Sequence, residues 1–500
     1  METPAPASAH APAQASLPTR TAIARPSYFL VVARADRRIV LAAVAGGVCF
    51  DLAARNGIAS VAATAWIAVI AAGLVLSRRV RGLAGRLMIG AAPLFGLLLT
   101  FRASPWVIVP TTLAVVLVLL LGVSHGADSS GLNDTLAALA TRIWLVLGHL
   151  ALAPGMLRPI AEPPSRGAAS KWAMAITRGF VLGVPVVLVV GLLLAWADPI
   201  FRSWFDLTAL LRHLMFAAIG AWVAIGLSRA ASARQPSPRL RSAPALGTVE
   251  AVFILGGLCG LYLAFVAAQF VALSDGGHHV LVTEGLTYAQ YARSGFFQLL
   301  ACAAITLIVL LAVRACASPD HPAIASLSAL TVALTVGVVV VAIRRLQLYE
   351  AAFGLTMLRL ACLVAAGWIG EVFLLLGASI PRRGLPRRRY ASVVVISGLV
   401  LIGLWGIANP ASIVARTNMH RAAQGHRFDL SQVAVLGPDA VPALLAGLGE
   451  AGPAEANQLR RQLCALSSGG AERSSRGAAF NLSVASARHD LARACASHAP

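Results

Sequence analysis

A long series of apolar blocks limits the fold of this chain more than any other feature. A transmembrane helix needs roughly 20 apolar residues to cross about 30 Å of hydrocarbon. Only helices and closed barrels pair all their backbone polar groups there. We therefore predict an all-α, polytopic transmembrane helix bundle of about eleven spans. The predicted spans are 37–54, 58–77, 86–101, 105–123, 178–197, 208–228, 248–273, 294–313, 324–343, 357–379 and 391–408.

Composition supports the same class of protein. Apolar residues make up 58% of the 500 residues and charged residues only 12%, whereas a soluble domain carries about 25% charged residues. A soluble enzyme of several domains is excluded, because too little polar surface remains to cover it. The net charge of +21 does not indicate nucleic-acid binding, since the arginines form short runs between the apolar blocks.

The arginines also predict an orientation, because cytoplasmic loops of membrane proteins are enriched in Arg and Lys. With the N-terminus inside, 24 basic residues before position 409 lie on the inner side, including the run at 382–389. The outer side then holds eight, namely Arg55, Arg102, Arg202, Arg212, Arg293, Arg344, Arg345 and Arg359. This arrangement predicts a multi-pass protein of a bacterial inner membrane with an extracytoplasmic C-terminus.

One further apolar segment, 134–157, contains Arg142 and His149. Both side chains are costly in hydrocarbon, and counting the segment as a span would invert every later loop. We therefore predict an interfacial helix. The expected division of the chain is a disordered basic cytoplasmic N-terminus (1–36), four spans (37–123), a cytoplasmic loop with the interfacial helix (124–177), seven spans (178–408) and an extracytoplasmic helical tail (409–500).

The tail is expected to form short helices over 439–448, 454–466 and 483–496, with an apolar stripe at Leu459, Leu463 and Leu466. A disordered appendage is the alternative. Cys464 and Cys495 lie on neighbouring predicted helices. A disulfide between them is expected if the tail faces an oxidising compartment, and two free thiols are the alternative.

No motif for catalysis, metal binding or a cofactor is present. The sequence lacks HExxH, paired CxxC, GxSxG, Walker A and GxGxxG patterns. We therefore name no catalytic residue, no metal ligand and no cofactor, and we expect a protein that is not an enzyme. An enzyme embedded in the membrane is the weakest alternative.

Glu371 is the clearest ionisable residue inside a predicted span, and such residues are functional candidates. Coupling to a proton or ion in a transporter or channel is one hypothesis, and a structural bond between helices is the other. Pro93, Pro110 and Pro185 interrupt their helices, and each frees a backbone carbonyl.

Several polar stretches are more specific than composition requires. They are Ala197–Phe201, Tyr288–Phe297, Arg345–Thr356, Asn409–Asn418 and Asp439–Leu444. With them, residues 175–445 resemble a family of bacterial polytopic membrane proteins known as domain of unknown function 4173, with family 4153 as the near alternative. The resemblance implies an integral membrane protein and no established activity. The family usually has a tyrosine where this chain has Phe353.

In the eleven-span arrangement these stretches gather at the outer ends of the helices, beside the tail. Their polar side chains either anchor helix ends at the interface or form an outer-surface site. We expect a membrane component that senses, scaffolds or docks a protein partner there, with the lipid bilayer as its solvent and no nucleic-acid partner. The candidate residues are Asp198, Tyr291, Arg293, Arg345, Tyr349, Glu350, Arg359 and Arg416.

Overall fold

The computed structural model describes the helical parts of the chain. The described residues are 37–80, 82–125, 135–153, 207–233, 246–274, 295–317, 321–380, 384–426, 431–450, 452–468 and 477–496, with the isolated positions 183, 186, 189 and 190. The predicted N-terminal disorder (1–36) and almost all of the predicted span 178–197 lie outside this set.

The described residues form helices and no strand, which confirms the all-α fold class. Nine of the described helices are long and apolar enough to cross a membrane. These are α1 (Arg37–Asn56), α3 (Leu83–Phe101), α4 (Pro105–Ser124), α9 (Leu207–Ser232), α10 (Thr248–Ser274), α13 (Phe296–Cys316), α14 (Pro322–Phe353), α15 (Met357–Ala378) and α16 (Arg387–Ala408). Helix α2 (Val61–Leu76) is apolar but has only 16 residues.

The first group of helices consists of α1–α4 and α9, which share one hydrophobic core. Helices α1 and α9 run antiparallel and in close contact, because small residues face each other. A Cβ atom added at Gly220 would lie 2.5 Å from the Cβ of Phe50 and 2.6 Å from the carbonyl oxygen of Gly46. The absence of a side chain at Gly220 thus permits the close approach of the two backbones.

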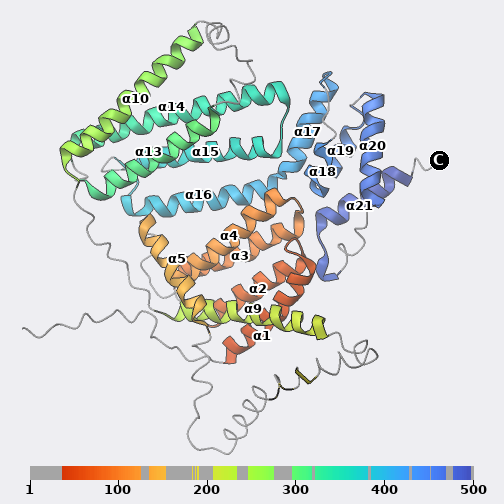
Figure 1. Ribbon diagram of the computed structural model, residues 1–500. Coiled ribbons are helices and arrows are strands. Elements are labelled where there is room, and N and C mark those ends of the chain that lie inside the picture. Colours follow the sequence, from red (N-terminus) through yellow and green to blue (C-terminus); the bar gives the residue numbers. More distant parts are fainter. Residues whose placement is uncertain are drawn as a thin grey trace, which may run out of the picture.

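The second group consists of α10 and α13–α15, around a separate core. Helix α16 lies between the two groups and contacts α3 and α4 on one side and α15 on the other (Figure 1). The fold is therefore two helix groups joined along α16.

Helix α5 (Leu136–Ala151) lies across the ends of the first group instead of parallel to its helices (Figure 1). Its Arg142 is fully buried, and one guanidinium nitrogen donates to the carbonyl oxygen of Ser124 at 3.2 Å. His149 is also buried, whereas Trp144 is 74% exposed. Arg142 and His149 therefore face the protein together with Leu139 and Val146, and Trp144 faces outward.

We name the two ends of the bundle by what they carry. The arginine end holds α5, the start of α1 and the ends of α2, α4, α9, α13 and α15. The tail end holds the opposite helix termini. The ends follow from contacts such as Arg38 with the Leu76 carbonyl oxygen at the arginine end and His213 with Asp51 at the tail end. Helix α5 lies at the arginine end, and α9 begins at the tail end.

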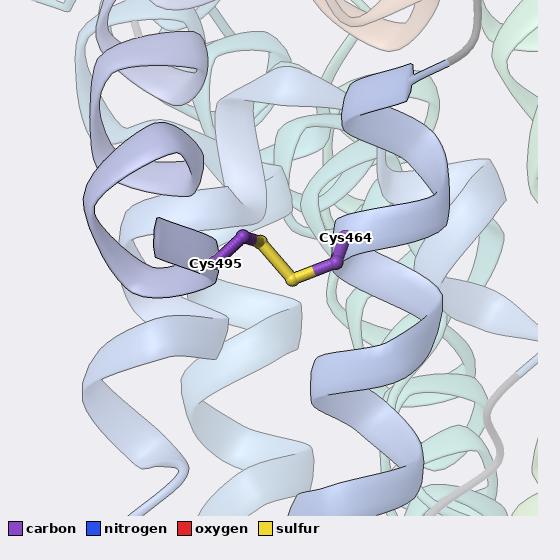
Figure 2. Close-up of a disulfide and its surroundings, with 2 residues drawn as sticks. All are labelled: Cys464 and Cys495. Carbon is purple, nitrogen blue, oxygen red and sulfur yellow. A yellow bond between two sulfur atoms is a disulfide. The ribbon is translucent and has the colours of Figure 1, made fainter. Parts of the chain in front are cut away.

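The C-terminal residues form a small helical domain at the tail end (Figure 1). Its helices are α17 (Pro410–Ala423), α18 (Gln432–Leu436), α19 (Val441–Gly447), α20 (Pro453–Ser468) and α21 (Leu482–Ala496), with the 3₁₀ turns η2 (Pro438–Ala440) and η4 (Gly477–Ala479). They share a core that includes Leu459 and Leu463. Cys464 of α20 and Cys495 of α21 are joined by a disulfide with a Cα–Cα distance of 6.0 Å (Figure 2). The tail is thus an ordered domain.

Candidate functional site

Asp439 connects the C-terminal domain to the transmembrane bundle. Its carboxylate is 2% exposed and accepts hydrogen bonds from the backbone N–H groups of Ala103, at 2.9 Å, and Ser104, at 2.8 Å. These groups precede α4, whose first N–H groups have no partner within the helix. The carboxylate therefore satisfies buried donors and lies at the positive end of the helix dipole.

Asn481 makes the equivalent connection to α3. Its side-chain nitrogen lies 3.0 Å from the carbonyl oxygen of Leu99, 2.9 Å from that of Arg102 and 3.3 Å from that of Ala59. Two of these carbonyls are at the C-terminus of α3, where the last carbonyls lack helical partners. The side-chain oxygen of Asn481 accepts from the N–H of Val484, so the same residue also caps α21.

Arg102 extends this set of contacts to α16. Its guanidinium donates to the carbonyl oxygens of Gly406 and Ile407, both at 2.8 Å, at the C-terminus of α16. Asn409, which follows, has a φ of +55° and caps α17 by accepting from the N–H of Ser412. Its side-chain nitrogen donates to the Asp439 carbonyl oxygen at 2.9 Å. The ends of α3, α4 and α16 are thereby held together by the C-terminal domain.

The turn between α14 and α15 is held by α17. The side chain of Asn418 pairs with both backbone groups of Leu355, accepting its N–H at 3.0 Å and donating to its carbonyl oxygen at 2.7 Å. Arg421 donates to the carbonyl oxygen of Ala351 at 2.8 Å. The turn itself needs Gly354, whose φ is +79°. The second helix group is thus also connected to the C-terminal domain.

The predicted outer-surface cluster is divided by the structure. Arg345, Tyr349, Glu350 and Arg359 lie around the α14–α15 turn. The Arg359 guanidinium stacks over the Tyr349 ring at 4.2 Å and donates to the Gly354 carbonyl oxygen, while Arg345 donates to Gln269 at 3.3 Å. Arg416 is exposed on α17. The other three predicted members, Asp198, Tyr291 and Arg293, lie outside the described residues.

Phe353 occupies the position where the family pattern has a tyrosine. Its side chain is 55% exposed, and its ring centroid lies 5.0 Å from that of Tyr349. The aromatic stack of Arg359, Tyr349 and Phe353 therefore forms without a hydroxyl at position 353.

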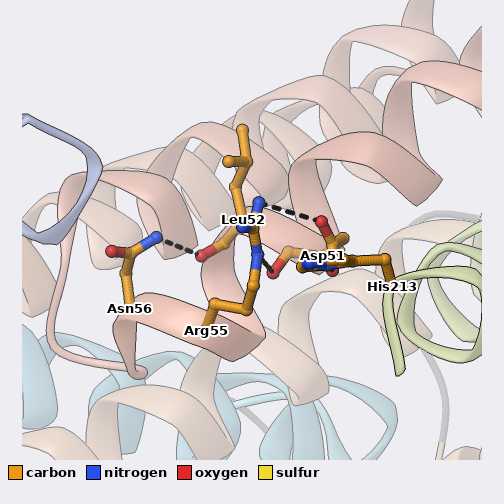
Figure 3. Close-up of polar contacts among 5 residues, drawn as sticks. All are labelled: Asp51, Leu52, Arg55, Asn56 and His213. Carbon is orange, nitrogen blue, oxygen red and sulfur yellow. Dashed lines mark hydrogen bonds and ion pairs between the residues drawn. The ribbon is translucent and has the colours of Figure 1, made fainter. Parts of the chain in front are cut away.

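A second polar group lies at the tail end of the first helix group (Figure 3). The Asp51 carboxylate accepts from His213 Nδ1 at 2.8 Å and pairs with Arg55 at 3.0 Å, so it connects α1 to the start of α9. The sequence predicts no site for Asp51 beyond its position at a block end. Asn481, Arg102 and Arg421 are also absent from the predicted cluster, although Asn481 stands directly before a helix, where Asn is a common N-cap residue.

Glu371 lies on α15, and its side chain is exposed from the protein. Among the described residues it makes no hydrogen bond or ion pair. The hypothesis that Glu371 forms a structural bond between helices is therefore not supported by any contact in the part of the chain that the structure describes. In the same part, no group of three His, Cys, Asp or Glu side chains could hold a metal ion.

The described residues form long apolar helices with a polar helical domain at one end of the bundle. These features define a multi-pass integral membrane protein. Comparison with protein families gives the identity more narrowly: the family described as "Domain of unknown function (DUF4153)" matches residues 88–447, from α3 to α19. The chain belongs to this family. It is the second of the two families considered above, and membership of the related family 4173 is not shown. Neither the curated proteins nor the solved structures contain a match.

Proposed function

We propose that this protein is a non-enzymatic membrane component that docks an acidic protein partner on α17 of its C-terminal domain and the adjoining α14–α15 turn. The observation that supports this function is the rigid attachment of the domain. Buried Asp439 and Asn481 connect it to the ends of α3 and α4, and Asn418 connects it to the α14–α15 turn. A preorganised surface binds a partner without the entropic cost of ordering it.

The charge of this surface supports an acidic partner. Five arginines lie on the last turns of α14, the first turn of α15 and α17, with Glu350 as the acidic residue among them. They are Arg344, Arg345, Arg359, Arg416 and Arg421. Arg344 and Arg416 are exposed. A predominantly basic surface steers acidic partners and contributes to specificity.

The arginine distribution supports an extracytoplasmic location for this surface. Runs of arginine in the sequence adjoin the helix termini at the opposite end of the bundle, as cytoplasmic loops require. The Cys464–Cys495 disulfide agrees with an oxidising compartment around the C-terminal domain.

Charge-neutralising variants test the docking function. The double variant Arg344→Gln/Arg416→Gln changes two exposed side chains, and Arg461→Gln, exposed on α20, is the matched control. The expected result is loss of a co-purifying partner, after crosslinking in intact membranes, in the double variant alone. Equal recovery of the partner from the double variant and the control, at equal folded yield, would contradict the proposal.

A transporter or channel is the second candidate, and the exposed Glu371 favours it. Solute or proton flux into proteoliposomes that is abolished by Glu371→Gln would support transport. Absence of flux together with intact partner binding would leave docking as the function.

A further inference from the structure

Pro110 prepares a site between the two helix groups. It lies in the second turn of α4 and has no N–H, so the carbonyl oxygen of Trp106, four residues earlier, has no helical partner there. Trp405 of α16 supplies that partner: its indole Nε1 donates to the Trp106 carbonyl oxygen at 2.8 Å. The proline thus fixes one indole ring between α4 and α16.

A second indole is fixed on α15. Trp368 Nε1 donates to the Ser397 hydroxyl at 3.1 Å. A Cβ atom at Gly398 would lie 3.0 Å from the Trp368 ring, so the glycine leaves the space that the ring occupies. Because both indole N–H groups already have partners, Trp368 and Trp405 offer a ligand the carbon surface of their rings.

These rings border a groove of about 610 Å³ between α4, α15 and α16. Pockets that hold drug-sized ligands enclose about 300–1,000 Å³. The groove opens sideways from the bundle, since its lining residue Val109 is 58% exposed and Ala365 is exposed. We call it the tryptophan groove, after its lining residues Trp106, Trp368 and Trp405.

Glu371 is not one of the lining residues, but it follows the last lining residue of α15, Trp368, on the side toward the arginine end. It is three residues after Trp368 and seven after Val364, which also lines the groove. Residues three apart on a helix are neighbours, with Cβ atoms about 5–6 Å apart. Glu371 is 14 residues into α15, roughly 21 Å from the start of the helix. An exposed carboxyl group therefore lies well inside a spanning segment, about one helical turn beyond Trp368.

We propose that the tryptophan groove binds lipophilic organic cations, such as quaternary ammonium or phosphonium compounds with apolar substituents, which enter from the bilayer. Indole faces attract such cations, and the Glu371 carboxylate supplies the opposite charge. A neutral lipid chain would gain nothing from the carboxylate, and an organic anion would be repelled. This inference is independent of the docking surface at the tail end.

Binding of tetraphenylphosphonium to the full-length protein in lipid nanodiscs tests the proposal. Equilibrium dialysis measures the bound cation, and empty nanodiscs give the partition into lipid. Tetraphenylborate, which has the same shape and the opposite charge, is the comparison ligand. We expect saturable binding of the cation at one site and no saturable binding of the anion.

The variants are Glu371→Gln, which removes the charge at nearly constant volume, and Gly398→Leu, whose side chain would displace the Trp368 ring and so disrupt the groove. Trp144→Leu, on the exposed face of α5, is the matched control. Glu371→Gln is expected to weaken cation binding about tenfold, Gly398→Leu to abolish it and Trp144→Leu to leave it unchanged. Unchanged affinity in Glu371→Gln, or equal binding of both ions, would overturn the proposal and indicate a groove for lipid chains. If Gly398→Leu does not fold, the Glu371→Gln result decides alone.

Discussion

Replacement of Asp439 by alanine tests how the C-terminal domain is attached. The substitution removes the acceptors of two backbone N–H groups, those of Ala103 and Ser104, and Ser104 is 1% exposed. A buried donor left without a partner costs about 1–3 kcal/mol. Loss of the charge at the helix N-terminus costs about 0.3–1 kcal/mol more. Allowing for partial access of water at Ala103, we expect a local loss of about 3 kcal/mol.

Hydrogen–deuterium exchange at the start of α4 measures this loss directly, because local opening has its own free energy. A loss of about 3 kcal/mol corresponds to roughly hundredfold faster exchange. Asp439→Asn keeps one acceptor, so it should give an intermediate rate. Glu450→Ala, an exposed site in the same domain, is the control. If residues 103–108 of Asp439→Ala exchange at the same rate as in the wild-type protein, the Asp439 carboxylate does not hold the C-terminal domain on α4.

Three other perturbations have definite expected outcomes. Gly220→Leu should prevent the close approach of α1 and α9, because even a Cβ there would lie 2.5 Å from Phe50; a sharply lower yield of folded protein in detergent is expected, and a normal yield would argue against the packing. Cys464→Ser opens a loop closed across a sequence separation of 31, so the C-terminal domain should lose about 4 kcal/mol and be cleaved faster by protease. Burial, and then the charge of Arg229, lower the pKa of His149. The unfolded chain therefore binds a proton more readily than the folded protein does, and the stability falls as the pH drops below about 6.5. His149→Gln should make the melting temperature depend less on pH between 7.5 and 5.5, and an unchanged dependence would contradict this effect of His149.

The helical framework could be predicted from the sequence because it depends on composition within each block. The segment 134–157 was predicted to avoid the hydrocarbon, since Arg142 and His149 are costly there. The structure adds that both side chains are buried in protein, with Arg142 against the end of α4. The two polar residues predict that the segment avoids the hydrocarbon, and they do not predict which neighbouring helix receives them.

The contacts at the tail end could not be predicted in the same way, because their partners are remote in sequence. Asp439 is 336 residues from Ala103, and Asn481 is 379 residues from Arg102. The polar stretches around Asn409, Asn418 and Asp439 were recognisable as unusual. Their hydrogen bonds to the ends of other helices follow only from the fold. Pro110 is a similar case. Its missing N–H predicts a free carbonyl oxygen at Trp106, but only the fold shows that this oxygen accepts the Trp405 N–H.

The location of the C-terminal domain outside the cytoplasm is the central claim, and protease protection tests it most directly. An epitope placed after Pro500 is followed in sealed, right-side-out spheroplasts treated with protease, with a cytoplasmic marker to verify the seal. Loss of the epitope from intact spheroplasts is the predicted result. Survival of the epitope until the membrane is permeabilised would contradict it and place the basic docking surface in the cytoplasm.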